Sequence, residues 1–219
     1  MQESESTSQT HESLNGLLIA IEGIDGAGKS TLIQHVATQL KNTFSSVVIT
    51  KEPGGSHLGK KLRALLQHRD TPICPTAEYL LFAADRAQHF NELIIPELKK
   101  NSIIISDRMA DSSVVYQGYG RGLDISIIQT INNWAMCWRQ PDIIIYLKLS
   151  GVQARERIKN RNKTLTAFEQ EDSNFTQKLI TGFDTLYAHD NKVLTLDATG
   201  HPEELAQAAY NFILSRYTP

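Results

Sequence analysis

Cysteine, tryptophan and long apolar runs are scarce in this chain of 219 residues. Its two cysteines, Cys74 and Cys137, stand in no metal-ligand spacing, so we expect buried or neutral thiols in a reducing compartment rather than a disulfide. No apolar run approaches the ~20 residues that a membrane-spanning helix needs. Neither sign of charge prevails, because 22 Lys and Arg against 24 Asp and Glu leave a net charge of −2. These absences disfavour a membrane protein and a nucleic-acid partner.

The first 16 residues, MQESESTSQTHESLNG, are polar and acidic and lack the basic segment and apolar core of a secretory signal. We expect them to form a disordered tail. Residues 17–219 contain no repeat, low-complexity segment or interdomain linker, and their number suits one α/β domain. We therefore expect a single domain in a cytoplasmic protein.

Short apolar runs, most of them rich in Val and Ile, alternate with longer amphipathic stretches. Strands are predicted over residues 17–21, 47–50, 103–106, 143–147 and 193–196. Helices are predicted over residues 31–40, 58–67, 76–100, 123–138, 152–163, 168–187 and 202–217, with a kink or early end near Pro96 and a glycine-rich loop over 109–122. This alternation predicts an α/β, three-layer fold, in which helices cover both faces of a five-stranded parallel sheet.

Residues 23–30 read G-I-D-G-A-G-K-S and match the P-loop pattern G-x-x-x-x-G-K-[ST], between a strand-like run and a helix-like stretch. The glycines let the backbone approach a polyphosphate, and the helix N-terminus adds the positive end of its dipole. Lys29 would bridge the β- and γ-phosphates, and Ser30 would offer its hydroxyl to Mg²⁺. We expect a P-loop NTPase fold whose nucleotide-binding residues are Gly23, Ile24, Asp25, Gly26, Ala27, Gly28, Lys29, Ser30 and Thr31.

Ligands of parallel sheets bind outside the carboxyl ends of the strands, so residues that follow each apolar run are candidates for the site. The third run ends in Ser106-Asp107-Arg108. A carboxylate at this place helps to hold Mg²⁺ in P-loop proteins, often through water, which makes Asp107 a metal candidate. Arg108 at the same rim suits a bidentate phosphate contact.

Two other segments have an ordinary and a functional interpretation. Phe82 and Arg86 share a helix face and could stack on a base and bond its edge, although periodicity alone favours a core Phe with an exposed Arg. The basic segment 152–163 is a solvated helix face by default, or a mobile lid in a phosphate-transfer enzyme. A regulatory GTPase is disfavoured, because residues 191–194 read Asn-Lys-Val-Leu and lack a base-reading Asp. A small nucleotide kinase fits the length and charge better.

With these motifs in order, the chain resembles the bacterial thymidylate kinases (dTMP kinases), P-loop nucleoside monophosphate kinases, from about residue 17 to its C-terminus. The markers are IEGIDGAGKST at 21–31, KEPGG at 51–55, LRALL at 62–66, LLFAADRAQH at 80–89, SDR at 106–108, DSSVVYQGYGRG at 111–122 and FEQED at 168–172. Together they are far more specific than the P-loop alone.

The resemblance implies transfer of the γ-phosphate of Mg-ATP to dTMP, which yields dTDP and ADP for dTTP synthesis, by a homodimer. It implies catalytic roles for Lys29, Arg108, Asp25, Arg157 and Arg161, the last two in a lid over about 151–169. It implies that dTMP contacts Arg63, Phe82, Arg86, Arg108, Ser113, Tyr116 and Gln117, and that Ser30 and Asp107 hold Mg²⁺. In this scheme Phe82 stacks on thymine, Arg86 bonds its O4 edge, and Tyr116 lies beneath the deoxyribose.

Two places depart from the family pattern. Bacterial members often carry Asp-Arg where Thr166-Ala167 stand here, so the role of that arginine is not carried over to Ala167. Some family members carry an arginine within the P-loop, and others place it in the lid. Because this P-loop has no arginine and the lid region is basic, the chain resembles the members with the lid arginine. Met109 stands where an aromatic residue or His is common, beside Arg108.

Two alternative functions stay open. A deoxynucleoside kinase would phosphorylate a 5′-hydroxyl with the help of a carboxylate base, and Arg63 and Arg108 speak against it because they suit an acceptor phosphate. A nucleotide-binding regulator with little turnover is the alternative that the altered lid end keeps open.

Overall fold

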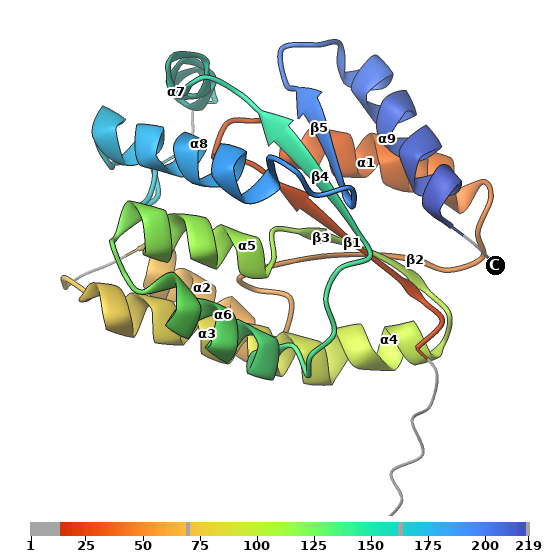
Figure 1. Cartoon of the computed structure of the whole chain (residues 1–219), viewed down its shortest axis with the longest axis horizontal. Helices are drawn as coiled ribbons and strands as arrows, with labels where there is room; N and C mark the ends of the chain where they lie inside the picture. Colours follow the sequence, from red (N-terminus) through yellow and green to blue (C-terminus); the bar gives the residue numbers. More distant parts are fainter. Residues whose placement is uncertain (1–13, 69–70, 162–163, 218–219) are drawn as a thin grey trace, which may run out of the picture.

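The computed structural model describes residues 14–68, 71–161 and 164–217. Five parallel strands form one sheet in the order β2-β3-β1-β4-β5 (Figure 1). The strands are β1 (Leu17–Glu22), β2 (Val47–Lys51), β3 (Ile103–Asp107), β4 (Ile143–Lys148) and β5 (Val193–Asp197). Each predicted strand is confirmed and extends one residue further. Central β1 is buried along its whole length, because it pairs with β3 and β4 and has helices on both faces.

The helices cover both faces of the sheet, as predicted. On one face α1 (Lys29–Lys41) and α9 (Pro202–Arg216) pack side by side. The other face packs against the π-helical segments η1 (Phe90–Ile94) and η2 (Val114–Gly120), α4 (Ile95–Lys99) and α8 (Ser173–Tyr187). The main core therefore lies on both sides of β1, β3 and β4.

Short polar side chains set the starts of several helices, because they accept backbone N–H groups that have no partner within the helix. The N-caps of α2 (His57–Gln67), α6 (Ile125–Ala135), α7 (Gly151–Asn160) and α8 are Ser56, Asp124, Ser150 and Asp172. The helix predicted over 168–187 was therefore wrong at its start: it begins after Asp172, and residues 167–170 form turns. This difference leaves the segment before α8 free to cross the site.

The helix predicted over 76–100 consists of α3 (Pro75–His89), η1 and α4 in unbroken succession. Pro96 stands in the first turn of α4, where its missing N–H is tolerated. The wider π turn directly before it adjusts the hydrogen-bond ladder, as such turns do inside helices. The chain therefore stays helical through Pro96 and ends its helix at Lys99.

The loop predicted over 109–122 was wrong, because this segment is helical. It forms α5 (Ala110–Ser113) and η2, and most of its residues are buried. Two of its glycines are sites of close packing rather than of turns: a Cβ at Gly118 would lie 2.9 Å from Ile125 Cγ1, and one at Gly120 would lie 2.7 Å from Phe175 Cε2. The packing of η2 against α6 and against α8 thus outweighs the low helix propensity of glycine.

Three further predictions concern the cysteines, the N-terminal tail and the lack of a membrane-spanning helix. Cys74 and Cys137 are free thiols, as expected, and both are exposed rather than buried: Cys74 precedes α3 as its N-cap, and Cys137 lies in the turn after α6. The predicted tail falls mostly on residues 1–13, outside the described residues, whereas Leu14 packs against the core. In the described part of the chain no helix is long and apolar enough to cross a membrane. The division into tail, domain and lid stays a prediction.

Candidate active site

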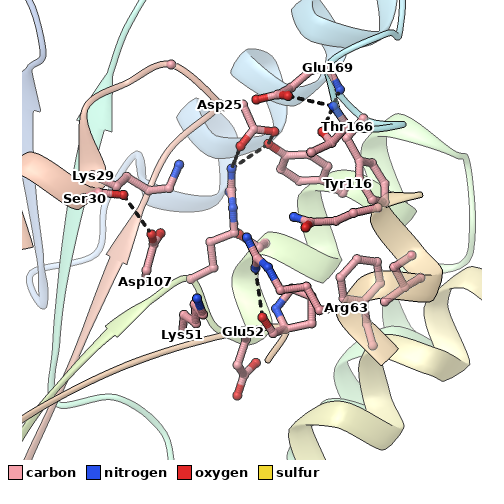
Figure 2. Close-up of a pocket in the computed structure, with 18 of the residues that line it drawn as sticks. Asp25, Lys29, Ser30, Lys51, Glu52, Arg63, Asp107, Tyr116, Thr166 and Glu169 are labelled. Atoms are coloured by element: carbon pink, nitrogen blue, oxygen red, sulfur yellow. Dashed lines mark hydrogen bonds and ion pairs between the residues drawn. The ribbon is translucent and has the colours of Figure 1, made fainter. Parts of the chain in front are cut away.

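A cavity of about 600 Å³ lies at the carboxyl ends of the strands, between the P-loop, α3, η2 and the segment that follows α7 (Figure 2). The predicted site residues that line it are Asp25, Gly26, Gly28, Lys29, Ser30, Thr31, Arg63, Phe82, Arg86, Asp107, Arg108, Ser113, Tyr116, Gln117, Arg157 and Arg161. Gly23, Ile24 and Ala27 do not line it, although their backbone carbonyls accept from side chains that do. The fold therefore gathers residues from the whole chain around one cavity.

The P-loop joins β1 to α1 through left-handed backbone at Gly26 (φ 81°) and Gly28 (φ 98°). Gly28 is the N-cap of α1 and offers no side chain, so the first N–H groups of the helix remain for an anion. Lys29 Nζ donates to the carbonyls of Gly23 (3.1 Å) and Ile24 (3.0 Å) across the loop. Burial and the nearby Arg108 lower the pKa of Lys29. The loop has the features of a phosphate cradle.

Ser30 and Asp107 bring oxygen atoms together at the start of α1 and the end of β3. Ser30 Oγ and Asp107 Oδ2 lie 3.5 Å apart (Figure 2). Asp107 Oδ1 is buried and finds no hydrogen-bond partner among the described residues. Mg²⁺ takes oxygen ligands and usually combines one or two protein oxygens with waters and phosphates. The pair therefore fits Mg²⁺ bound with a nucleotide.

Arg108 follows β3 with φ 69°, a left-handed conformation that residues other than glycine rarely adopt. Its N–H donates to Ile21 O (3.0 Å), and its carbonyl accepts from Ser106 Oγ (2.7 Å). The next N–H, that of Met109, donates to Glu22 Oε1 at 2.7 Å. These bonds hold a strained turn that aims the Arg108 guanidinium into the cavity.

The Arg108 guanidinium is a hub of hydrogen bonds. Its Nη2 donates to Asp25 Oδ1 (2.7 Å) and to the Tyr116 hydroxyl (2.9 Å). Its Nη1 donates to Gly23 O (2.8 Å) and to Ser112 Oγ (3.0 Å). The P-loop and η2 are thus tied together through one cation.

Asp25 stays ionised at neutral pH. Its burial acts to raise its pKa, but Arg108 and Lys29 outweigh burial and lower the pKa to about 2. The same carboxylate helps to raise the pKa of Arg108 above its ordinary value, against the opposing effect of burial. The site therefore holds an anion between two cations, which can redistribute when a phosphate binds.

Arg86 on α3 is buried, with 1% of its surface exposed, contrary to the exposed Arg that periodicity alone favoured. Its Nε donates to Glu52 Oε2 (2.9 Å), and its Nη1 donates to Asn132 Oδ1 (2.7 Å). Its Nη2 donates to Ser113 Oγ (3.1 Å) and to Met109 O (3.3 Å) at the cavity wall. Because so many acceptors fix it, the guanidinium is pre-oriented toward a ligand edge.

Aromatic rings line the same end of the cavity. The Phe168 ring centroid lies 5.9 Å from that of Phe82 and 5.9 Å from that of Tyr116. Gln117 Nε2 donates to Glu78 Oε1 at 2.9 Å. Flat apolar rings beside polar edges suit a nucleobase, which offers a π face and a hydrogen-bonding edge.

Three further arginines reach the cavity. Arg63 Nη1 donates to Pro53 O at 2.9 Å (Figure 2), and burial lowers the pKa of Arg63. Arg157 Nη1 lies 3.4 Å from Gly26 O of the P-loop, and its Nη2 donates to Ala198 O, after β5, at 2.8 Å. Arg161 forms a 2.6 Å ion pair with Glu169. The cations are thus distributed over both ends of the cavity and suit phosphate groups at its centre.

Sequence reasoning assigned no role to several residues that shape the site, chiefly Glu22, Glu52, Asn132 and Phe168. The KEPGG segment was noted only as a family marker, yet Glu52 within it anchors Arg86. Nothing in the pattern around Asn132 distinguishes it from an exposed polar residue of α6. Charged residues at strand ends, such as Glu22, were a usable signal for groups near the site.

Comparisons with known proteins agree with one another. The family model described as thymidylate kinase matches residues 21–209. The thymidylate kinase of Halothermothrix orenii is 40% identical over 202 residues, which cover 90% of this chain and 96% of that protein. The one from Carboxydothermus hydrogenoformans is 41% identical over 192 residues (88% and 94%). The solved thymidylate kinase of Ehrlichia chaffeensis has a TM-score of 0.74 at 27% identity and covers 91% and 98% of the two chains. The chain therefore belongs to the thymidylate kinase family.

Proposed function

We propose that this protein transfers the γ-phosphate of Mg-ATP to dTMP and releases dTDP and ADP. The observation that carries the proposal is the single cavity shared by the P-loop and by the aromatic end around Phe82 and Arg86. A donor triphosphate and an acceptor nucleotide would meet there, with Arg108 between them. The names of the relatives support dTMP as the acceptor.

The reaction needs positioning more than acid–base chemistry. A phosphate oxygen of dTMP is already a nucleophile, so no strong base is required. Lys29 would hold the β- and γ-phosphates, and Arg108 would leave Asp25 in part to contact both transferred and acceptor phosphates. Ser30 and Asp107 would hold Mg²⁺, which neutralises phosphate charge when bound. Arg63 would contact the acceptor phosphate.

The acceptor base would lie at the aromatic end. Phe82 would stack on thymine, with Arg86, Ser113 and Gln117 along its polar edge. Tyr116 would lie beneath the deoxyribose, where its ring disfavours a 2′-hydroxyl. The pre-orientation of Arg86 by Glu52 supports base reading, since a fixed donor discriminates better than a mobile one.

The lid roles belong to Arg157 and Arg161. Arg157 already contacts the P-loop and the loop after β5, which suits the donor nucleotide. Arg161 is paired with Glu169 at the cavity and would turn to the phosphates when these are bound. Closure would exclude water, so that ATP is not hydrolysed. Residue Lys163, also in the basic segment, lies outside the described residues.

The two alternatives have less support. A deoxynucleoside kinase needs a carboxylate base at the acceptor, whereas Asp25 and Glu52, two carboxylates that line the cavity, are paired with Arg108 and Arg86, which lower their pKa values. A regulator with little turnover would not need the cations at both ends. The relatives are named thymidylate kinases and favour neither alternative.

We also propose a homodimer, formed through the exposed apolar side chains of α2, α3 and α6. Ile127, Trp134 and Trp138 are 57%, 75% and 69% exposed at α6 and the turn after it. Leu65 on α2 and Leu80 on α3 are half exposed; α3 packs against α6, and α2 packs against α3 (Figure 1). Large exposed apolar groups of this kind are typical of protein interfaces.

The cytoplasmic location stays a prediction.

The proposal is tested by coupled ADP release with Mg-ATP against dTMP, dUMP, dCMP, AMP and thymidine. We expect a response to dTMP, a weak one to dUMP, and none to thymidine. Lys29→Ala should lower turnover with dTMP about a hundredfold, the scale of losing one charge partner in the transition state, with unchanged circular dichroism. A response to thymidine alone would favour the deoxynucleoside kinase. ATP binding without ADP release on any acceptor would favour the regulator.

A further inference from the structure

The segment of residues 164–172, which we call the strap, crosses the base end of the cavity between α7 and α8. Its residues 167–170 form turns, and four of its residues line the cavity: Thr164, Thr166, Phe168 and Glu169. Its own folding is local: Thr166 N–H donates to Glu169 Oε2 at 2.9 Å, and Glu169 pairs with Arg161. Ala167 N–H also donates to Gln67 O, at the end of α2, at 3.1 Å. These bonds shape the strap and hold it to α2 and to the end of α7, but they do not reach α3 or η2, and the connection to those helices is made elsewhere.

Arg121, directly after η2, makes that connection. Its Nη2 forms a 2.6 Å ion pair with Glu171 Oε1 of the strap, and its Nε lies 3.3 Å from Glu78 Oε1 on α3. The Glu78 side chain is 1% exposed and that of Arg121 is 18% exposed, so the cation is largely shielded from solvent. Its guanidinium carbon lies 4.6 Å from the ring centroid of Phe175 and 6.0 Å from that of Phe168. One arginine thus joins the strap, α3 and α8.

Both ends of this connection reach the base pocket. Glu78, on the α3 side, accepts the side-chain N–H of Gln117, one of the residues proposed at the base. Phe168, on the strap side, lies against Phe82 and Tyr116. Arginine suits the place better than lysine, because its planar fork can serve two carboxylates while its face stacks on a ring.

We propose that Arg121 is a positioning residue for the acceptor base. It fastens the strap to α3 and η2, so that Phe168 forms a wall of the thymine slot and Gln117 keeps its orientation. Arg121 does not line the cavity itself, and its influence passes through Glu171 and Glu78. The inference rests on the proposed function and adds to it a determinant of acceptor affinity outside the pocket.

Kinetics of Arg121→Ala test the proposal. We expect the KM for dTMP to rise about tenfold, the scale of losing charge-assisted hydrogen bonds, while the KM for ATP and kcat stay within about twofold. Arg121→Lys should recover part of the loss, because it keeps the charge but loses the fork. Lys100→Ala, which removes the exposed Lys100–Glu97 pair, is the matched control and should change neither KM. Equal rises in both KM values would overturn the proposal.

Glu171→Gln is a second variant, which tests the proposal with less risk to folding. Its carboxylate is 28% exposed, and the substitution keeps the ion pair between Arg121 and Glu78. We expect it to raise the KM for dTMP as well, and the double variant with Arg121→Ala to be no worse than Arg121→Ala alone. An unchanged KM for dTMP in Glu171→Gln would mean that the strap is not fastened this way and would overturn the proposal.

A readout without turnover separates this inference from the proposed function. Amide hydrogen exchange in the strap, measured without nucleotide, should be faster in Arg121→Ala and Glu171→Gln than in the wild type and the Lys100→Ala control. Unchanged exchange would show that Arg121 does not fasten the strap, even if dTMP is the acceptor. A wild type that is inactive on dTMP would overturn the proposed function, while faster exchange in the variants would still show the fastening.

Discussion

Glu22 is a carboxylate without exposed surface at the end of β1. Its oxygens accept from Met109 N–H (2.7 Å) and Ser112 Oγ (2.6 Å), and Ser112 Oγ accepts from Arg108 Nη1 (3.0 Å). Glu22 thus supports the strained backbone of Arg108 and its guanidinium. Burial and Asp111 raise the pKa of Glu22 to about 7, although its hydrogen bonds favour the charged form.

We predict that the wild type loses stability as the pH rises, because Glu22 becomes ionised. Glu22→Gln should remove this loss. The carboxyl has an ordinary pKa of 4.5 in the unfolded chain and a pKa of about 7 in the folded protein. The folded protein therefore keeps a proton that the unfolded chain has already lost. Glu22 stabilises the fold fully below its unfolded pKa, and this contribution disappears as pH rises through its folded pKa. The shift corresponds to roughly 3 kcal/mol.

Urea denaturation at about pH 5 and about pH 8 measures this effect. The free energy of unfolding of Glu22→Gln, relative to the wild type, should rise between these values by up to about 3 kcal/mol. Glu156→Gln on the exposed face of α7 is the control and should differ by less than about 0.5 kcal/mol at either pH. Parallel pH curves for Glu22→Gln and the wild type would contradict the prediction.

Among the elements, η2 depends on glycine for its place against α8. A Cβ at Gly182 of α8 would lie 2.9 Å from Tyr119 Cγ and 3.1 Å from Tyr119 Cβ. Gly120 of η2 is just as close to α8: a Cβ there would lie 2.7 Å from Phe175 Cε2. Because η2 carries Tyr116 and Gln117 into the cavity, the distance between these two helices sets where those side chains lie.

We predict that Gly182→Ala lowers the free energy of unfolding by about 1–3 kcal/mol, the usual range for an extra methyl group in a packed core. It should also raise the KM for dTMP more than that for ATP, because η2 is pushed while the P-loop is not. Thr181→Ala, at the neighbouring exposed position of α8, is the control. Denaturation and steady-state kinetics measure both effects, and an unaltered stability of Gly182→Ala would refute the close-packing argument.

For the whole molecule, α6 matters because some of its apolar residues are buried and others are exposed. Ile128 is buried against α3 and η2, and Ala135 is buried as well, whereas Ile127 and Trp134 are exposed. Asn132, on the buried side, holds Arg86. The helix that would form the dimer surface is therefore the helix that anchors the proposed base-reading arginine.

We predict that Trp134→Asp dissociates the proposed dimer, with the dissociation constant raised by roughly a hundredfold, because a buried charge without a partner is costly at an interface. Sedimentation velocity over a range of concentrations measures the oligomeric state. Val152→Asp is the matched control, since Val152 is 79% exposed on α7, away from α6. A Trp134→Asp variant that remains as dimeric as the control would exclude this surface as the interface.

Local patterns were enough to predict the sheet and the P-loop. Strand-length runs of Val and Ile mark buried parallel strands, and the glycine and lysine spacing marks a phosphate loop wherever it occurs. The same reasoning failed for 109–122, where glycines that favour a loop locally are required for helix packing at Gly118 and Gly120. It failed for the start of α8, because Asp172 caps the helix later than periodicity suggests.

By itself, the sequence determined the five strands, their parallel sheet, the P-loop and the family, because each of these is marked by short runs of residues close together in the chain. Only the tertiary structure decided how the side chains of the cavity are held. Arg86 is anchored by Glu52, 34 residues before it, and by Asn132, 46 residues after it, and Arg108 meets Asp25 across 83 residues. The physical reason is that a hydrogen bond depends on distance in space, which no local pattern contains.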